Sequence, residues 1–365
     1  MRVYRLQAGS AHTGELPNGC VLCRRGSKLV LLVTGRCDTG CFYCPLSKAK
    51  KGKDVIYADE LLAQSDEDVI SEAIAIGAQG TGVTGGDPIL ELDRTLRLVR
   101  LLKERFGEGH HVHLYTSTID RQAYLALQRA GLDELRIHPP LGLWTRMEES
   151  GLAEAVKGLR MKVGIEVPAI PGKDRETEAL IRFADSIGLA FVNLNELEFS
   201  ETNARALSAR GIATKTDISA AARGSEELAR KMLALGLSIP LHFCSCSYKD
   251  SVQLRNRLRR RAKRTARPFE LVTDDGTFVK GVIEDSPKEA MHLLAEKFEV
   301  PQELMHLDEE KGRLEVASWV LLELSTQLPY DSFVVEEYPT ADRLEVEREK
   351  LPRKREKKGS TFRPR

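Results

Sequence analysis

The sequence contains no stretch close to the ~18 consecutive apolar residues that a membrane-spanning helix requires. Its first residues, MRVYRLQAGSAHTGELPNG, lack the apolar core of a signal peptide. The formal net charge is only +1, so the total charge points to no class of partner, and the sequence shows no internal repeat. From these absences we expect a cytoplasmic protein without a membrane partner.

The chain does contain enough apolar sequence to fold. It has 365 residues, of which 42% are apolar and 30% are charged, as in globular proteins with a sizeable core. One α/β barrel of roughly 200 to 250 residues and a smaller appended domain would account for this length.

Between residues 28 and 243, short apolar or β-branched runs alternate with longer helical patterns, which predicts βα units around a parallel sheet. Ser65 and Asp68 form the N-cap pattern of one crossover helix, and LELDRTLRLVRLLKERFG has helical spacing before Gly107. We therefore expect an α/β fold, a partial (β/α) barrel with its chemistry at the carboxyl ends of the strands. Seven strands are predicted, at residues 28–34, 80–84, 111–116, 134–138, 163–167, 191–195 and 238–243.

The pattern changes after residue 243. A hairpin turned by Asp274-Asp275-Gly276, the helical SPKEAMHLLAEKF and the apolar ASWVLLELSTQL predict a small α+β domain. The last segment is charged and has too few apolar residues to be buried, so we expect disorder there. The predicted domains are an N-terminal extension with Cys-x2-Cys over 1–27, a barrel over 28–250, a basic helix or linker over 251–267, the α+β domain over 268–350 and a basic tail over 351–365.

Three of the seven cysteines, Cys37, Cys41 and Cys44, directly follow the first predicted strand. In a cytoplasmic chain such cysteines indicate metal or redox chemistry, because thiols stay reduced in that compartment. Thiolates select zinc or iron–sulfur centres, and three of them leave one metal ion open to water or substrate. The alternative is three buried cysteines or part of a zinc knuckle.

The spacing Cys-x3-Cys-x2-Cys, with Tyr43 before the third cysteine, resembles the signature of the radical S-adenosylmethionine (SAM) superfamily. After the second predicted strand, Gly85-Gly86-Asp87-Pro88 is similar to that family's Gly-Gly-Glu-Pro element, with Asp in place of Glu. In the family this element meets the amino group of SAM. The resemblance therefore implies that these four residues and Tyr43 lie at the cofactor.

The resemblance continues at later strand ends and covers residues 28–243. Thr116 and Ser117 resemble the polar strand end that meets the ribose or carboxylate of SAM. The segment VGIEVPAIPG resembles the family's adenine-side strand, and Asn193 and Asn195 are expected at the same mouth. Within the superfamily, the chain most resembles the pyruvate formate-lyase activating enzyme group and uncharacterised archaeal proteins related to it.

The resemblance also implies a reaction. A [4Fe-4S] cluster on Cys37, Cys41 and Cys44 would leave one iron open for SAM, which is cleaved with an electron from a low-potential donor. The resulting 5′-deoxyadenosyl radical takes a hydrogen atom from a substrate. The chain is thus expected to be a radical SAM oxidoreductase or transferase, and its sequence identifies neither the substrate nor a catalytic residue.

Other polar side chains at predicted strand ends face the expected substrate side, where any of them could bind substrate or relay a proton. By contrast, we expect His110, His111 and His113 to cap a helix or flank a strand. The polar strand-end residues are His138, Glu166, Asn195, Glu196 and Glu198.

Four cysteines remain, Cys20 and Cys23 before the first predicted strand and Cys244 and Cys246 after the last. If the sheet curls round, these pairs meet as a second four-thiolate site that holds zinc or an auxiliary iron–sulfur cluster. Cys20 and Cys23 followed by Arg-Arg-Gly are typical of a zinc knuckle. The Cys-x-Cys spacing of Cys244 and Cys246 is tighter than usual for zinc, so His242 could replace one of these thiolates as a ligand. The alternative is that some of the four are inert core residues.

Residues 255–267 are strongly basic, with eight Arg or Lys in thirteen positions, and residues 353–365 share this character. Such a concentration suits contact with phosphates, so we hypothesise an RNA substrate, such as a tRNA nucleoside. A protein substrate, as in glycyl-radical activation, is the alternative within the enzyme class. Two further alternatives are a surface helix paired with the acidic strip around Glu336 and Glu345, and a non-catalytic Fe–S or zinc protein that binds nucleic acid.

Overall fold

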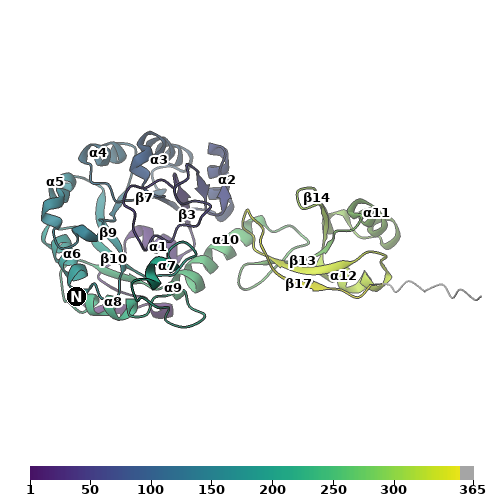
Figure 1. Ribbon diagram of the computed structural model, residues 1–365. Coiled ribbons are helices and arrows are strands. Elements are labelled where there is room, and N and C mark those ends of the chain that lie inside the picture. The colour runs from purple at the N-terminus through teal and green to yellow at the C-terminus, as the bar shows by residue number, and fades with distance from the viewer. Residues whose placement is uncertain (354–365) are drawn as a thin grey trace, which may run out of the picture. The chain divides into compact units, whose positions relative to one another are not determined.

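The computed structural model describes residues 1–353, and the chain divides into one unit over Met1–Arg257 and a second that begins at Leu258. Each unit has its own sheet and its own core (Figure 1). The predicted basic tail over 351–365 lies, beyond its first three residues, outside the described residues.

The described residues of the first unit contain an eleven-stranded sheet whose centre consists of the seven predicted strands, all parallel. Their order across the sheet is β11-β10-β9-β8-β7-β6-β3. The sheet stays open between β11 and β3, so the prediction of a partial (β/α) barrel is confirmed. The strand bounds are β3 Lys28–Leu32, β6 Gly80–Thr84, β7 His111–Thr116, β8 Glu134–Ile137, β9 Lys162–Ala169, β10 Phe191–Glu196 and β11 Leu241–Cys244.

Two short hairpins that the sequence did not reveal extend this sheet at its edges. β1 (Val3–Arg5) pairs with β2 (Ala11–Thr13), which lies antiparallel to β11. At the other edge, β4 (Tyr57–Ala58) lies antiparallel to β3 and pairs with β5 (Leu61–Leu62). The N-terminal 27 residues therefore belong to the barrel unit.

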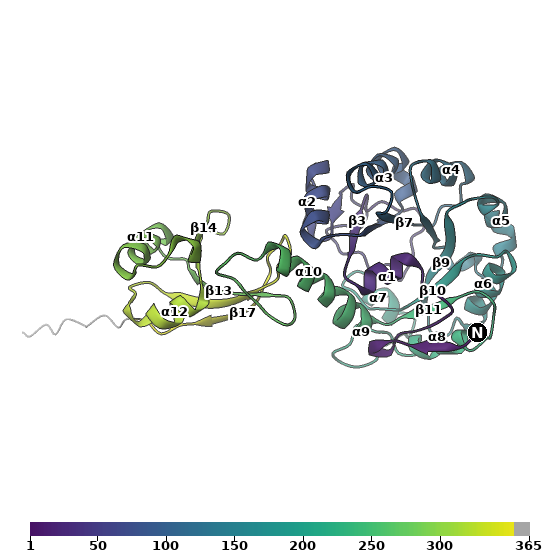
Figure 2. The ribbon, with the colours of Figure 1, turned by 180° about the vertical axis from the view of Figure 1, so that it is seen from behind.

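Helices between the strands cover the outside of the sheet, as Figures 1 and 2 show from opposite sides. Leu31 and Leu114 are fully buried in the core that the strands form with these helices. One helix begins at the predicted N-cap, where Ser65 and Asp68 form a capping box. None of the described helices is long and apolar enough to cross a membrane. The helix bounds are α2 Asp66–Ile76, α3 Leu92–Phe106, α4 Arg121–Arg129, α5 Leu152–Val156, α6 Asp174–Ser186, α7 Ala204–Ser208 and α8 Ser225–Leu233.

The short helix α1 (Asn18–Arg24) packs against β3, β6 and β7 on the side of the sheet away from these helices (Figure 2). Gly19 makes the close approach feasible, because a Cβ there would lie 2.6 Å from Arg136 Nη2 and 2.7 Å from His113 Nδ1. Cys20 and Cys23 are carried by this helix, so the predicted knuckle at this pair is corrected to a helical turn.

After β11 the chain continues through α9 (Cys246–Tyr248), a π-helical turn over Lys249–Leu254 and α10 (Arg255–Thr265). At the end of the first unit, Arg257 is largely buried and forms ion pairs with Asp59 and Glu60. At least one arginine of the basic segment is therefore used to hold the barrel unit together.

In the described part of the second unit, two helices pack on an antiparallel sheet, and β12 and β13 form the predicted hairpin. Leu294 and Leu321 of these helices are fully buried in the core of the unit. The strand and helix bounds are β12 Leu271–Val272, β13 Phe278–Ile283, β14 Met305–Asp308, β15 Arg313–Val316, β16 Ser332–Glu337, β17 Glu345–Lys350, α11 Pro287–Phe298 and α12 Ser318–Leu324.

A buried ionic network joins three strands of this second sheet. Lys280 on β13 is 1% exposed, and its Nζ lies 3.0 Å from a carboxylate oxygen of each of Glu270, Glu315 and Glu337. Burial would raise the pKa of Glu337, but Lys280 and Arg313 outweigh it and lower that pKa to about 2. Glu337 therefore remains charged inside the unit and depends on these cations.

Replacing Lys280 with Met leaves buried carboxylates without this counter-ion. We expect the free energy of unfolding of the second unit to fall by about 3–5 kcal/mol. Hydrogen–deuterium exchange of the peptide containing β13 measures this loss in the full chain. Lys288→Met, at an exposed position of α11, is the matched control and should change the value by less than about 0.5 kcal/mol. Equal protection of β13 in both variants would contradict a structural role for the network.

Candidate active site

A cavity of about 730 Å³ opens at the carboxyl ends of the parallel strands. The strand-end location is the one expected for chemistry in such a fold. Its wall brings together three groups that are far apart in the sequence, namely the cysteine loop, the glycine pair after β6 and polar residues that follow later strands. The predicted residues that line it are Cys37, Cys41, Tyr43, Cys44, Gly85, Gly86, Thr116, Ser117, His138, Glu166, Asn195, Glu196 and Glu198.

The start of the cysteine loop is held by the glycine pair through the backbone. The Gly86 N–H donates to the Thr34 carbonyl at 2.7 Å, and the Asp87 N–H donates to the Arg36 carbonyl at 2.7 Å. A Cβ on Gly86 would lie 1.9 Å from the Arg36 oxygen, and one on Gly85 would lie 2.4 Å from the Thr34 oxygen. Only glycine allows this approach, so the pair fixes the segment that leads into Cys37.

The end of the loop is held by Tyr43, whose ring is buried. Its hydroxyl lies 3.1 Å from His138 Nε2, and the other ring nitrogen of His138 lies 2.8 Å from the Glu166 carbonyl. The Asn203 side-chain amide donates to the Tyr43 carbonyl at 3.0 Å. Tyr43 thus ties the loop to the strand ends as well as lining the cavity.

Two of the three thiols of the loop share one hydroxyl neighbour. Thr39 Oγ1 lies 3.0 Å from Cys37 Sγ and 3.5 Å from Cys41 Sγ. Burial would raise the pKa of the Cys41 thiol, but hydrogen bonds from His138, Thr39 and Tyr43 outweigh it and lower that pKa to about 7. Since the thiolate is the form that binds metal, the loop is prepared for ligation.

The spacing of these thiols fits a cluster better than a single ion. Among the described residues, the one group of three Cys, His, Asp or Glu ligand atoms within 4.8 Å of one another contains no cysteine. A single zinc ion would require such close sulfurs, because each Zn–S bond is about 2.3 Å long. An iron–sulfur cluster, in contrast, spreads its ligands over separate irons, and the open cavity beside the thiols leaves room for an additional ligand.

Asp87 was expected to contact the amino group of SAM, and its placement corrects this expectation. Its side chain is 2% exposed and does not line the cavity. The carboxylate accepts hydrogen bonds from the Thr116 hydroxyl at 2.6 Å, from both the N–H and the hydroxyl of Ser117 and of Thr118, and from the Ile89 N–H. With these donors its oxygens are occupied, so Asp87 positions the polar end of β7, and its neighbour Pro88 is buried behind it.

Asn193 also lies elsewhere than predicted. It is 1% exposed and absent from the cavity wall, and its amide donates to Glu166 Oε2 at 2.8 Å and to Cys20 Sγ at 3.3 Å. Asn195, two residues on, lines the cavity and donates to Glu166 Oε1 at 2.9 Å. The two side chains lie on the same face of β10, but Asn193 is two residues earlier and so lies roughly 7 Å farther from the carboxyl end of the strand.

The expected substrate side of the cavity carries charged residues. Burial would raise the pKa of Glu166, but Arg136, Asn193 and Asn195 outweigh it and lower that pKa to about 2. Glu198 accepts a hydrogen bond from Lys249 at 3.4 Å. The wall therefore presents the ionised carboxylate of Glu166 in the same cavity as the cysteine loop at neutral pH.

The remaining four cysteines are only partly gathered. Cys23 Sγ lies 3.0 Å from Gln253 Oε1, and Gln253 Nε2 donates to Cys244 Sγ at 3.4 Å, so one amide stands between the two pairs. Cys246 instead points to Glu198. Burial raises the pKa of Cys20 to about 11 and that of Cys244 to about 12, which keeps both protonated. The second four-thiolate site stays a prediction.

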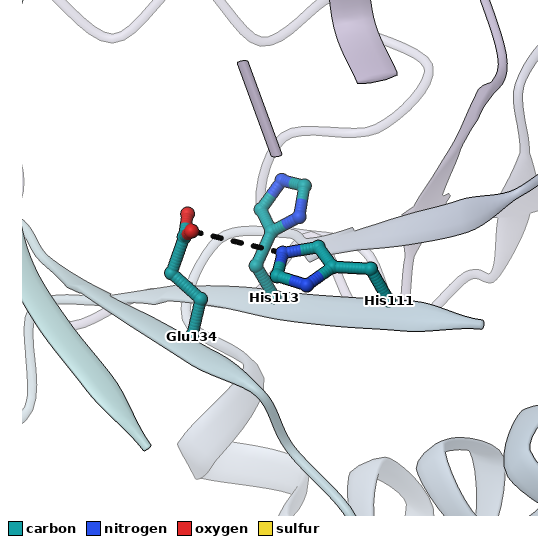
Figure 3. Close-up of side chains that lie close together, drawn as sticks. All are labelled: His111, His113 and Glu134. Carbon is teal, nitrogen blue, oxygen red and sulfur yellow. Dashed lines mark ion pairs between the residues drawn. The ribbon is translucent and has the colours of Figure 1, made fainter. Parts of the chain in front are cut away.

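A cluster that the sequence reasoning missed lies at the opposite end of the strands. His111, His113 and Glu134 come together there, although the histidines were expected only to cap a helix or flank a strand (Figure 3). The available signal was the His-x-His spacing at the start of one strand and a glutamate at the start of the next, because parallel strands begin at the same edge of a sheet.

Asp87→Asn tests the positioning role of this carboxylate. The amide keeps the size but turns one acceptor into a donor, so we expect the free energy of unfolding to fall by about 1.5–3 kcal/mol. Hydrogen–deuterium exchange should accelerate at residues 116–118. Asp93→Asn, at an exposed position in the first turn of α3, is the control and should leave exchange unchanged. Unaltered exchange at 116–118 in Asp87→Asn would show that the carboxylate does not hold the strand end.

Comparison with known proteins agrees with this geometry. Residues 31–139 match the family described as the Radical SAM superfamily, and residues 276–351 match a domain of unknown function, DUF8061. Over 358 residues, the chain is 39% identical to a Methanocaldococcus jannaschii protein named "Putative glycyl-radical enzyme activating enzyme", with 92% of each chain covered.

Similarity to solved structures is more distant. Methylornithine synthase is 15% identical with a TM-score of 0.38, and covers 60% of this chain and 70% of its own. SuiB of Streptococcus suis bound to SAM is 12% identical with a TM-score of 0.37, and covers 60% of this chain and 50% of its own. The identification rests instead on the family match and the full-length relative: the chain belongs to the radical SAM superfamily, whose enzymes use a [4Fe-4S] cluster to cleave SAM reductively.

Proposed function

We propose that Cys37, Cys41 and Cys44 hold the [4Fe-4S] cluster and that SAM lies between this loop and the glycine pair. The observation that carries the proposal is that the three thiols, Gly85 and Gly86 line one cavity. When bound, the cluster and SAM supply one-electron cleavage of the sulfonium carbon–sulfur bond and a 5′-deoxyadenosyl radical.

The residues of the chain then have distinct tasks. Gly85 and Gly86 bring the backbone close enough to orient SAM and fix the start of the cysteine loop. Thr116 and Ser117, positioned by Asp87, offer hydroxyl groups to the polar part of SAM. Tyr43 fixes the end of the cysteine loop and, with its buried ring, helps to keep water away from the thiols.

For the substrate, we propose a protein from whose main chain the radical takes a hydrogen atom. The full-length relative bears the name of a glycyl-radical activating enzyme. The carboxylates of Glu166, Glu196 and Glu198 line the cavity and suit peptide N–H donors better than phosphates. Arg257 of the basic segment is paired with carboxylates, so the RNA hypothesis stays a prediction without a contact that favours it.

Metal analysis after anaerobic purification tests the cluster assignment. The wild-type chain should contain about four iron atoms and the same amount of sulfide. The variant with Cys37, Cys41 and Cys44 all changed to Ala should lose this iron, and its formation of 5′-deoxyadenosine with dithionite and SAM should drop to background. Wild-type rates in that triple variant would refute the assignment.

Cys20→Ala/Cys23→Ala is the matched control and also tests the second metal site. It should keep the iron of the first cluster and its cleavage activity. A further four iron atoms, or one zinc, present in the wild type and lost only in this double variant, would establish the second site and its metal. Identical metal content in the wild type and the double variant would remove that site from the proposal.

The class of substrate is tested by stimulation of SAM cleavage. Extract from source-organism cells grown in deuterated medium is desalted and added to the reduced enzyme, and deuterium in 5′-deoxyadenosine is measured. For a protein substrate, protease treatment of the extract should abolish the label, whereas ribonuclease should leave it unchanged. The reverse result would refute the protein substrate and support the RNA hypothesis.

A further inference from the structure

The cluster of His111, His113 and Glu134 lies in the amino-terminal halves of β7 and β8 (Figure 3). His113 and Glu134 are direct partners in the strand register, and one ligand atom from each of the three residues lies within 4.8 Å of the other two. His111 Nε2 is 3.7 Å from Glu134 Oε2. This spacing matches ligands around one metal ion, because metal–nitrogen and metal–oxygen bonds are about 2.0–2.2 Å long.

The atoms that face one another make no hydrogen bond. His113 and Glu134 are both 0% exposed, and His111 is largely buried. Within the described residues, His111 Nε2, His113 Nδ1 and Glu134 Oε2 all lack a hydrogen bond. Buried polar atoms are almost always satisfied, and three unsatisfied atoms converging on one point indicate a missing common partner.

The opposite atom of His113 and of Glu134, in contrast, has a hydrogen-bond partner. His113 Nε2 lies 3.3 Å from the Tyr115 hydroxyl. His111 Nδ1 lies 3.9 Å from Asp133 Oδ2, which is too long for a hydrogen bond. Glu134 Oε1 accepts a hydrogen bond from Arg136 Nε at 2.7 Å. Metal-binding side chains are commonly held in this way, with the non-coordinating atom fixed by an outer neighbour.

Three cations lie near the cluster. Two of them are paired, since Arg136 contacts Glu134 and Glu166, and Lys103 donates to Asp133. The third is Lys28, which lies close to His113.

The surroundings give access to one of the three ligands. A pocket of about 500 Å³ reaches His111 from the surface between α1 and the end of α3, where Asn18, Arg25 and Phe106 also line it. On the other side Gly19 packs closely on His113, because a Cβ there would lie 2.7 Å from the unpartnered Nδ1. A cation would thus approach from solvent at His111.

We propose that His111 Nε2, His113 Nδ1 and Glu134 Oε2 bind one divalent transition-metal ion of the zinc class. Two imidazoles and one carboxylate are a donor set that Zn²⁺ and its neighbours favour over Mg²⁺ or Ca²⁺. Three protein ligands leave a coordination position for water. The cysteine loop does not contribute to this site, because His111 lies five residues before Thr116 along β7, a rise of roughly 16 Å, and Tyr115, which lines the cavity, contacts His113 from the cavity side.

The test uses the full chain in the Cys37→Ala/Cys41→Ala/Cys44→Ala background, stripped of metal. Zn²⁺ is titrated in competition with a chromophoric chelator, and one equivalent should bind and raise the melting temperature. His111→Ala should weaken binding at least about 100-fold, since even loss of an outer neighbour costs 10- to 100-fold. His111 is the least buried of the three ligands, and an unchanged melting temperature without metal confirms that this variant is folded.

His110→Ala is the matched control. His110 lines the same pocket, but its Nε2 is bonded to the Thr81 hydroxyl at 2.8 Å, so Zn²⁺ affinity should stay within about threefold of the parent. Co²⁺ reports the ligands, because thiolate coordination adds strong charge-transfer absorption and nitrogen–oxygen coordination does not. Equal Zn²⁺ affinity in His111→Ala and its parent, or a thiolate spectrum lost with Cys20→Ala/Cys23→Ala, would overturn the site and leave water as the occupant of this space.

Discussion

The buried guanidinium of Arg136 is the interaction on which the interior of the barrel unit depends. It pairs with Glu134 and Glu166 on neighbouring strands and donates to the Tyr115 hydroxyl at 3.2 Å. Its charged plane also lies 5.3 Å from the Tyr115 ring and 5.4 Å from the Phe191 ring. A buried cation requires such partners, and in return it keeps the buried carboxylate of Glu166 ionised.

This arrangement links the two ends of the strands. Glu166 faces the cavity, and Glu134 faces the histidine pair. In Glu134 the oxygen that Arg136 does not use has no hydrogen bond, whereas in Glu166 that oxygen accepts from Asn195 at the cavity. One central cation therefore orients a carboxylate at the cavity and a carboxylate at the histidine cluster, and Tyr115 lies between the two sites.

Much of this could be predicted from the sequence, because it depends on local patterns. Strand alternation gave the sheet, and the close spacing of Cys37, Cys41 and Cys44 gave the loop at its carboxyl edge. The roles of Asp87 and Asn193 could not be predicted in this way. Asp87 contacts either a cofactor or Thr116 of its own chain, depending on how far this short side chain reaches. That distance is set by the tertiary structure and cannot be read from the sequence. The depth of Asn193 likewise depends on the strand register.

The cluster of His111, His113 and Glu134 could not be predicted from the sequence for a different reason. A histidine is identified as a metal ligand by the side chains around it. His111 and His113 have such neighbours only in the folded chain, where β8 places Glu134 alongside them and α1 covers them at Gly19. Helix α1 also carries Cys20 and Cys23, so one helix borders both the histidine cluster and the path toward Cys244. A metal ion bound to this cluster would thus stabilise the part of the sheet against which α1 packs. The positions of Cys20 and Cys23 would then depend on the packing of α1 and not on a zinc knuckle formed by these two cysteines.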